Sequence, residues 1–117
     1  MGRGKEELVR IIPYLNNNPK SVELMKVWTK VFQFRLDDDE PFYITVKRGQ
    51  MMLEDGLYPD PDLIMVGDAK EFAQVAEGYK DITHPIAHGQ LRLSKGKNWE
   101  LISFSRILGT TQYLKRR

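Results

Sequence analysis

Apolar and polar side chains alternate along much of the first half of the chain. This alternation predicts β-strands, because every second side chain of a strand faces the same side of its sheet. We expect three strands, at 31–36, 42–46 and 50–55. Polar Gln33 is expected to face solvent. Tight turns join the strands into an antiparallel meander, and Gly49 can supply the positive φ that the second turn needs.

A strand–helix–strand unit follows the meander. The strand at 62–66 shows no polar alternation, which predicts burial on both faces in the middle of a sheet. The strand at 90–94 alternates strictly. Between them we expect a helix at 69–77, followed by a second helical turn near Pro85. The apolar stripe of the helix consists of Phe72, Val75, Ala76 and Tyr79. Such a connection must cross and cover one face of the sheet, and we expect function on that covered face.

Helical periodicity appears at both ends of the chain. Between 5 and 15 apolar residues recur at helical spacing, and Pro13 is expected to kink or end that helix. Asn18 then predicts an N-cap, with Pro19 at the first position of a second helix. A last helix is expected after a cap at Asn98.

Together these elements predict an α+β fold, in which helices cover one face of a five-stranded, mostly antiparallel sheet. The length of 117 residues predicts one domain over 1–117. No apolar run approaches the ~18 residues that span a bilayer, and the polar start does not look like a secretory signal. We therefore expect cytoplasmic residence.

The net charge and the cysteine, histidine and acidic residues restrict which ligands and partners the chain can bind. The net charge is only +2, with the basic excess at the two ends, so no nucleic-acid partner is expected. The chain has no cysteine, which excludes disulfides and thiolate metal sites. His84 and His88 have the spacing of a metal chelate but no third ligand is evident, so we expect no metal. With Lys80, they could instead meet a carboxylate or phosphate. The acidic run at 37–40 favours a solvated turn over a calcium loop.

Signals of catalysis are scarce. There is no Gly-x-Ser-x-Gly elbow, no glycine-rich phosphate loop and no cysteine nucleophile. We therefore expect no catalytic residue and no cofactor.

Several segments resemble the sterol carrier protein type-2 family. They are FRL at 34–36, FYITVKRG at 42–49, PDLIMV at 61–66, the helix and glycine at 69–78, and GQLRLSKG at 89–96. Gln90 replaces the lysine usual in the family, and Lys95 is an insertion-like departure before Gly96. The likeness covers about 23–108. It implies a curved five-stranded sheet under helices, with an apolar tunnel that holds a lipid. Members of this family also take fatty acids, fatty acyl-CoA and phospholipids, and some serve only as subunits or appended domains.

Large or flexible apolar residues are the candidates to line such a tunnel. They are Met25, Trp28, Phe32, Met51, Met52, Phe72, Val75, Trp99, Ile102 and Phe104. The alternative is that these residues simply fill the core. The expected function is a non-catalytic carrier of a fatty acid, fatty acyl-CoA or sterol-like lipid. Transient membrane contact and a homodimer are both compatible with the sequence. The alternatives are a self-associating interaction module without a ligand and an accessory subunit of a lipid-metabolising enzyme.

Overall fold

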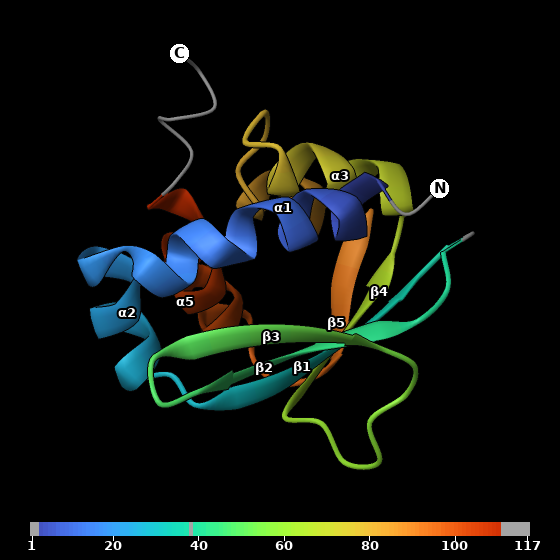
Figure 1. The fold of residues 1–117 in the computed structure, drawn as a ribbon. Coiled ribbons are helices and arrows are strands. Elements are labelled where there is room, and N and C mark those ends of the chain that lie inside the picture. Colours follow the sequence, from blue (N-terminus) through green and yellow to red (C-terminus); the bar gives the residue numbers. More distant parts are fainter. Residues whose placement is uncertain (1–2, 38, 111–117) are drawn as a thin grey trace.

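The computed structural model describes residues 3–37 and 39–110 in two layers, a sheet with helices on one side of it (Figure 1). Its elements are, in chain order, α1 (Arg3–Asn17), α2 (Pro19–Lys26), β1 (Lys30–Leu36), β2 (Phe42–Lys47), β3 (Gln50–Asp55), β4 (Leu63–Gly67), α3 (Ala69–Ala76), α4 (Thr83–Ala87), β5 (Leu91–Lys95) and α5 (Asn98–Gly109). Helices α1, α2, α3 and α5 lie above the sheet, and the long β3–β4 loop extends below it (Figure 1).

The sheet has five strands in the order β3-β2-β1-β4-β5. Only β1 and β4 run parallel, and the other neighbouring pairs are antiparallel. The expected α+β class and mostly antiparallel sheet are therefore confirmed. Central β1 places Phe34 opposite Phe42 on one side and Met65 on the other. The middle of the covered face is thus lined by large apolar side chains.

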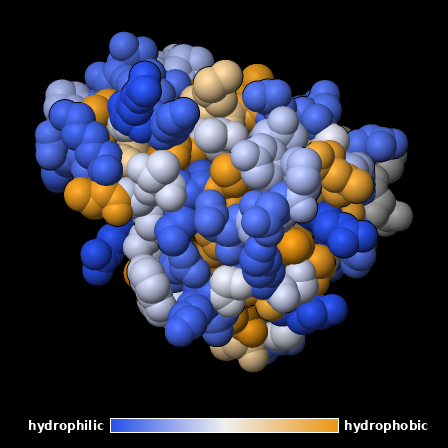
Figure 2. Space-filling model, turned by 90° about the horizontal axis from the view of Figure 1, so that it is seen from below, coloured by the Kyte–Doolittle hydropathy of each residue, from blue (hydrophilic) through white to orange (hydrophobic). Residues whose placement is uncertain are grey.

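The strand β4 lies inside the sheet, as expected, but only one of its faces is fully buried. Leu63 and Met65 are buried beneath the helices, whereas Ile64 and Val66 are half-buried. The reason is that the helices cover only one face. Figure 2, the view from below, shows hydrophilic residues spread over the open side with smaller apolar areas between them.

The helix α1 continues through Pro13 to Asn17. Of the two expected effects of this proline, an end of the helix is therefore wrong, and a kink stays a prediction. Its burial explains this: Leu8, Ile11 and Leu15 lie on one face and are all buried in the core. Packing of that face offsets the hydrogen bond that proline removes.

The next helix, α2, begins as its sequence predicts. The side chain of Asn18 accepts a hydrogen bond from the Lys20 backbone N–H at 2.9 Å, and Pro19 is the first helical residue.

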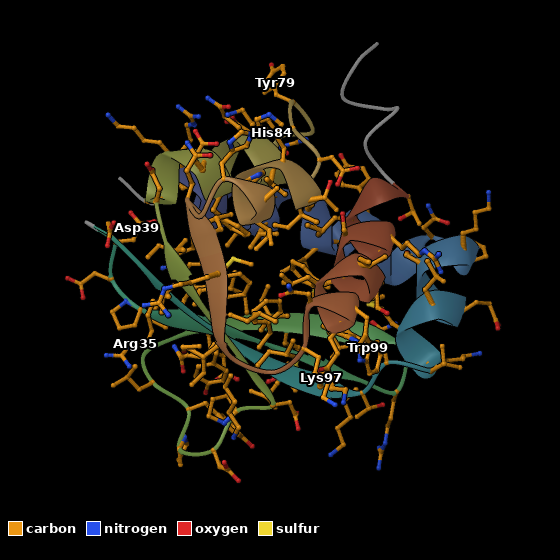
Figure 3. The ribbon with its side chains drawn as sticks, turned by 180° about the vertical axis from the view of Figure 1, so that it is seen from behind. Arg35, Asp39, Tyr79, His84, Lys97 and Trp99 are labelled. Atoms are coloured by element: carbon orange, nitrogen blue, oxygen red, sulfur yellow. The ribbon has the colours of Figure 1, made fainter. Side chains whose placement is uncertain are left out.

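Two other expected helix boundaries need correction. The helix α3 ends at Ala76, so Tyr79 does not belong to its apolar stripe; it is 79% exposed and points outward (Figure 3). Gly78, with φ +85°, turns the chain away after the helix. The cap of α5 is Lys97 rather than Asn98, because the Glu100 carboxylate accepts the Lys97 backbone N–H at 3.0 Å.

Gln33 is buried, not exposed as the alternation predicts. Only 2% of it is accessible, because the β3–β4 loop folds over this part of the open face. Its side-chain amide donates to the carbonyl oxygens of Phe42 (2.9 Å) and Gly56 (3.0 Å) and accepts the Tyr58 backbone N–H at 2.7 Å. These hydrogen bonds satisfy an amide that would be costly to bury alone.

Two glycines allow close approaches that a side chain would prevent. A Cβ at Gly4 of α1 would lie 2.6 Å from Cδ2 of Phe72 in α3, so the two helices meet closely above the sheet. At Gly67 of β4, with φ +137°, a Cβ would lie 2.2 Å from the backbone oxygen of Gln90. The sequence therefore needs glycine where β4 meets the start of β5.

Candidate functional site

The covered face of the sheet carries a cluster of buried aromatic rings, which we call the phenylalanine cluster. Its members are Phe32, Phe34, Phe42, Phe72 and Phe104, each at most 1% exposed. The Phe34 ring centroid lies 4.4 Å from that of Phe32 and 4.8 Å from that of Phe42. From the helices, Phe72 approaches Phe34 at 5.0 Å and Phe104 approaches Phe32 at 5.0 Å. The sheet thus meets α3 and α5 through tilted and edge-on ring pairs, and the stacked pairs lie within the sheet.

Three methionines are also fully buried between the layers. Met25 comes from α2, Met51 from β3 and Met65 from β4, and each is at most 1% exposed. Methionine is unbranched, with several rotatable bonds and a polarisable sulfur, so it adapts to neighbours of different shape. The interior therefore combines a rigid aromatic part with side chains that can change conformation.

Trp28 lies where α2, β1 and α5 come together. It is 4% exposed, and its ring centroid is 5.9 Å from that of Phe104 and 6.5 Å from that of Phe32. Its indole Nε1 is buried and has no hydrogen-bond partner in the described part of the chain. This places an unsatisfied donor against the phenylalanine cluster.

An ion pair ties the first turn of α5 to the start of β1. Lys30 Nζ lies 3.0 Å from Oε2 of Glu100, a residue that is only 7% exposed. Burial by itself would raise the pKa of Glu100, but the Lys97 backbone N–H and the Lys30 ammonium favour the ionised form. The net effect is a pKa below the ordinary value. Glu100 is therefore a structural carboxylate, already engaged by two donors.

Most of the ten predicted lining residues lie in the interior. The seven buried ones are Met25, Trp28, Phe32, Met51, Phe72, Val75 and Phe104. The interior placement is wrong for Met52 (59% exposed), Trp99 (59%) and Ile102 (44%). Met52 follows inward-facing Met51 in β3 and so faces the open side of the sheet. Trp99 and Ile102 lie three residues apart on the outer face of α5, opposite Phe104 and the other buried residues of that helix.

Sequence reasoning left Phe34 and Met65 out of this set, although both are fully buried on the covered face. A signal for Phe34 was present, because it alternates with Phe32 in β1. Met65 lies in the uniformly apolar strand β4, where no alternation distinguishes one face from the other.

The outer face of α5 joins exposed apolar residues to basic ones. Trp99 and Ile102 are followed one turn later by exposed Arg106, and exposed Lys97 precedes them. Figure 3 shows Trp99 beside Lys97, at the end of the molecule opposite Tyr79. This surface, Lys97, Trp99, Ile102 and Arg106, is called the α5 face below.

The other polar candidates do not converge on a site. His84 and His88 are exposed with ring centroids 4.6 Å apart, and Lys80 pairs with Glu71 at 2.6 Å. Within residues 3–37 and 39–110, no group of three or more His, Cys, Asp or Glu side chains could hold a metal ion. Asp38 of the acidic turn and the basic residues 115–117 lie outside the described residues.

No described helix is both long enough and apolar enough to cross a bilayer.

Comparison with solved structures supports the same fold in proteins of distant sequence. The palmitated SCP2L2 protein of Aedes aegypti is 13% identical, with a TM-score of 0.68 over 92% of this chain and 93% of that one. The apo form of sterol carrier protein 2 from Yarrowia lipolytica is 21% identical, with a TM-score of 0.67 over 88% of each chain. The stereoselective inverting sec-alkylsulfatase Pisa1 from Pseudomonas sp. is 17% identical, with a TM-score of 0.64. That match covers 74% of this chain but only 14% of the sulfatase.

At the level of sequence, comparison with curated proteins gave no match. The sequence model of one family, described as the SCP-2 sterol transfer family, matches residues 12–97, most of the chain. The matched range contains all five strands of the sheet and the buried helix α3. The chain therefore belongs to the SCP-2 sterol transfer family.

Proposed function

We propose that this protein is a non-catalytic lipid carrier that holds a fatty acid, fatty acyl-CoA or similar lipid in an apolar tunnel between the sheet and the helices. The observation that carries the proposal is the apolar layer there, the phenylalanine cluster with three buried methionines, in a chain of the SCP-2 family. The Aedes aegypti protein of the same fold was solved in a palmitated form, which supports an acyl chain as ligand. Cytoplasmic residence stays a prediction of the sequence.

The energetics permit such a ligand. Burial of about 14 methylene groups at ~0.8 kcal/mol each contributes roughly 11 kcal/mol. Ordering the ligand and the side chains around it costs several kcal/mol. Subtracting about 4 kcal/mol leaves roughly 7 kcal/mol, which corresponds to a dissociation constant of about 10 μM. Rotamer changes at Met25, Met51 and Met65 would let the interior adjust to the chain.

Sequestration fits the interior better than catalysis does. Apart from the indole of Trp28, the buried polar side chains of the described residues are Ser21, Gln33 and Glu100. Each is already engaged: Ser21 Oγ donates to backbone carbonyls, Gln33 binds the β3–β4 loop, and Glu100 pairs with Lys30. No acid–base pair is left among these three side chains to act on a substrate. An accessory subunit of a lipid-metabolising enzyme is the alternative.

The first test is native mass spectrometry of freshly purified protein, followed by solvent extraction and identification of any lipid. The proposal expects a stoichiometric acyl lipid. If the protein is empty, palmitate and palmitoyl-CoA are titrated while intrinsic fluorescence is recorded. Trp99→Phe isolates the buried Trp28 signal, which should change at micromolar ligand. An empty protein whose Trp28 emission stays unchanged with both probes overturns the carrier proposal.

We also propose that the α5 face makes transient contact with anionic membranes. A tryptophan ring suits the membrane–water interface, and each nearby Lys or Arg adds about 1 kcal/mol at an anionic surface. Lys97 and Arg106 provide that charge beside Trp99 and Ile102.

Sedimentation with phosphatidylcholine vesicles, with and without phosphatidylserine, tests this contact. Trp99→Ser with Ile102→Ser should abolish binding to the anionic vesicles. Tyr79→Ser is the matched control, because Tyr79 is an exposed aromatic residue at the opposite end (Figure 3). If the double variant instead converts a dimer to a monomer in analytical ultracentrifugation, the α5 face is a homodimer interface and membrane contact is refuted.

A further inference from the structure

The indole N–H of Trp28 is a buried donor for which the described part of the chain provides no acceptor. The residue is 4% exposed, and Nε1 has no hydrogen-bond partner within residues 3–37 and 39–110. Buried polar groups are nearly always hydrogen-bonded, and leaving one unpaired is unfavourable. Every other buried polar side chain in this part of the chain has a partner. Phenylalanine would fill the same region without that penalty, so the donor needs an explanation.

The ring of Trp28 lies at one end of the phenylalanine cluster. The ring contacts Phe32 of β1 and Phe104 of α5, both members of the phenylalanine cluster. Trp28 follows the end of α2 and directly precedes β1. A lipid chain lying among the phenylalanine rings would therefore bring one of its ends to the indole.

The charges nearby restrict what that end can be. Lys30, two residues after Trp28, is already paired with Glu100, so this ion pair offers no spare positive charge. An ionised carboxylate would need more than one neutral donor to repay its desolvation. A carbonyl or hydroxyl oxygen needs only the single hydrogen bond that an indole can give.

We propose that Trp28 Nε1–H donates a hydrogen bond to a neutral oxygen of the bound lipid, an ester or thioester carbonyl or a hydroxyl. The inference rests on the proposed function and narrows its ligand class. Lipids with a neutral oxygen at one end are favoured over plain hydrocarbons and over ionised fatty acids. Trp28 is thus a specificity-determining residue at the polar end of the site.

Two-dimensional ¹⁵N–¹H NMR of the full chain tests this directly, because the sequence contains only two tryptophans. Trp99→Phe assigns the two indole signals. The probes are methyl decanoate, 1-decanol, decane and ionised decanoate. Methyl decanoate and 1-decanol should move the Trp28 indole proton downfield, as a new hydrogen bond does, whereas decane should not. The exposed Trp99 signal is the internal reference.

Binding constants supply the second measurement. In Trp28→Phe, which keeps an aromatic ring and removes the donor, the preference for methyl decanoate over decane should fall about tenfold. Trp99→Phe, which removes the other indole donor from an exposed position, should retain the preference. If Trp28→Phe does not fold, the indole shifts of the native chain decide alone.

Several outcomes overturn the inference. Probes that bind while the Trp28 proton stays in place show that another group satisfies the indole, a water included. An equal shift with decane shows a change of packing only. A preference for decanoate that depends on Trp28 shows that the ligand oxygen is charged. In all three cases the carrier function stands. If neither these probes nor palmitate and palmitoyl-CoA bind, the proposed function and this inference fall together.

Discussion

The carboxylate of Glu100 fastens α5 to the sheet, and removing its charge tests that role. In Glu100→Gln the side chain keeps its shape and can still accept the hydrogen bond from the Lys97 backbone N–H, which is 3.0 Å long in the native protein. What is lost is the charged interaction with Lys30 Nζ, also at 3.0 Å. The substitution therefore isolates one ion pair from the helix cap.

The expected cost follows from the burial of the two partners. A hydrogen bond to a charged group contributes about 1.5–3 kcal/mol net. The Glu100 side chain is nearly buried, but 31% of the Lys30 side chain is accessible, so the lysine regains water when its partner is neutral. We therefore expect the low end of the range, about 1.5 kcal/mol. For a chain of this length that lowers Tm by roughly 6 °C.

The pH dependence of the stability tests the role of Glu100 more specifically than a stability measured at one pH. The pKa of Glu100 in the folded protein is lowered, so its stabilisation is complete above its unfolded value of about 4.3. It is lost as pH falls through the folded pKa. In urea unfolding, the difference in the free energy of unfolding between the native protein and Glu100→Gln should be constant near neutral pH. In acid this difference should shrink.

A matched control separates this effect from generic loss of charge. Glu23→Gln removes an exposed carboxylate, 3.5 Å from Lys26 Nζ, and should cost under about 0.5 kcal/mol. Equal costs for the two variants, or a difference that persists unchanged into acid, would refute the assignment of Glu100 as a buried ion-pair partner.

Three further predictions concern the fold and use urea unfolding. Gly67→Ala should lower the free energy of unfolding by about 3 kcal/mol or more, since its Cβ would lie 2.2 Å from the Gln90 backbone oxygen. Gly56→Ala, also at positive φ but with open space around it, should cost about 1 kcal/mol, and equal costs would contradict the steric argument. Gln33→Leu should cost about 2–3 kcal/mol, because it leaves loop and strand backbone groups unpaired; an unchanged midpoint would show that the loop does not depend on that amide. Phe34→Ala should cost about 3–5 kcal/mol, and less than 1 kcal/mol would mean that the interior collapses freely around it.

Local signals in the sequence correctly identified several features that a single element decides. Alternation predicted the strands of the meander, and the alternating apolar residues of β1, Phe32, Phe34 and Leu36, are all buried. Asn18 and Pro19 marked the start of α2, and the cap geometry agrees. These features follow from strand periodicity and from the unpaired N–H groups of one helix, so they need no knowledge of distant neighbours.

The sequence by itself therefore determined the fold class, most of the inward-facing residues and, through its motifs, the family. Only the tertiary structure decided the strand order, with β1 parallel to β4, because that pairing joins segments far apart in the chain. It also decided which side of α5 meets solvent, and so placed Trp99 and Ile102 outside. Gln33 is covered by a loop, and Trp28 Nε1 has no acceptor among residues 3–37 and 39–110. Burial and hydrogen-bond satisfaction depend on every element packed around a residue, and no local pattern carries that information.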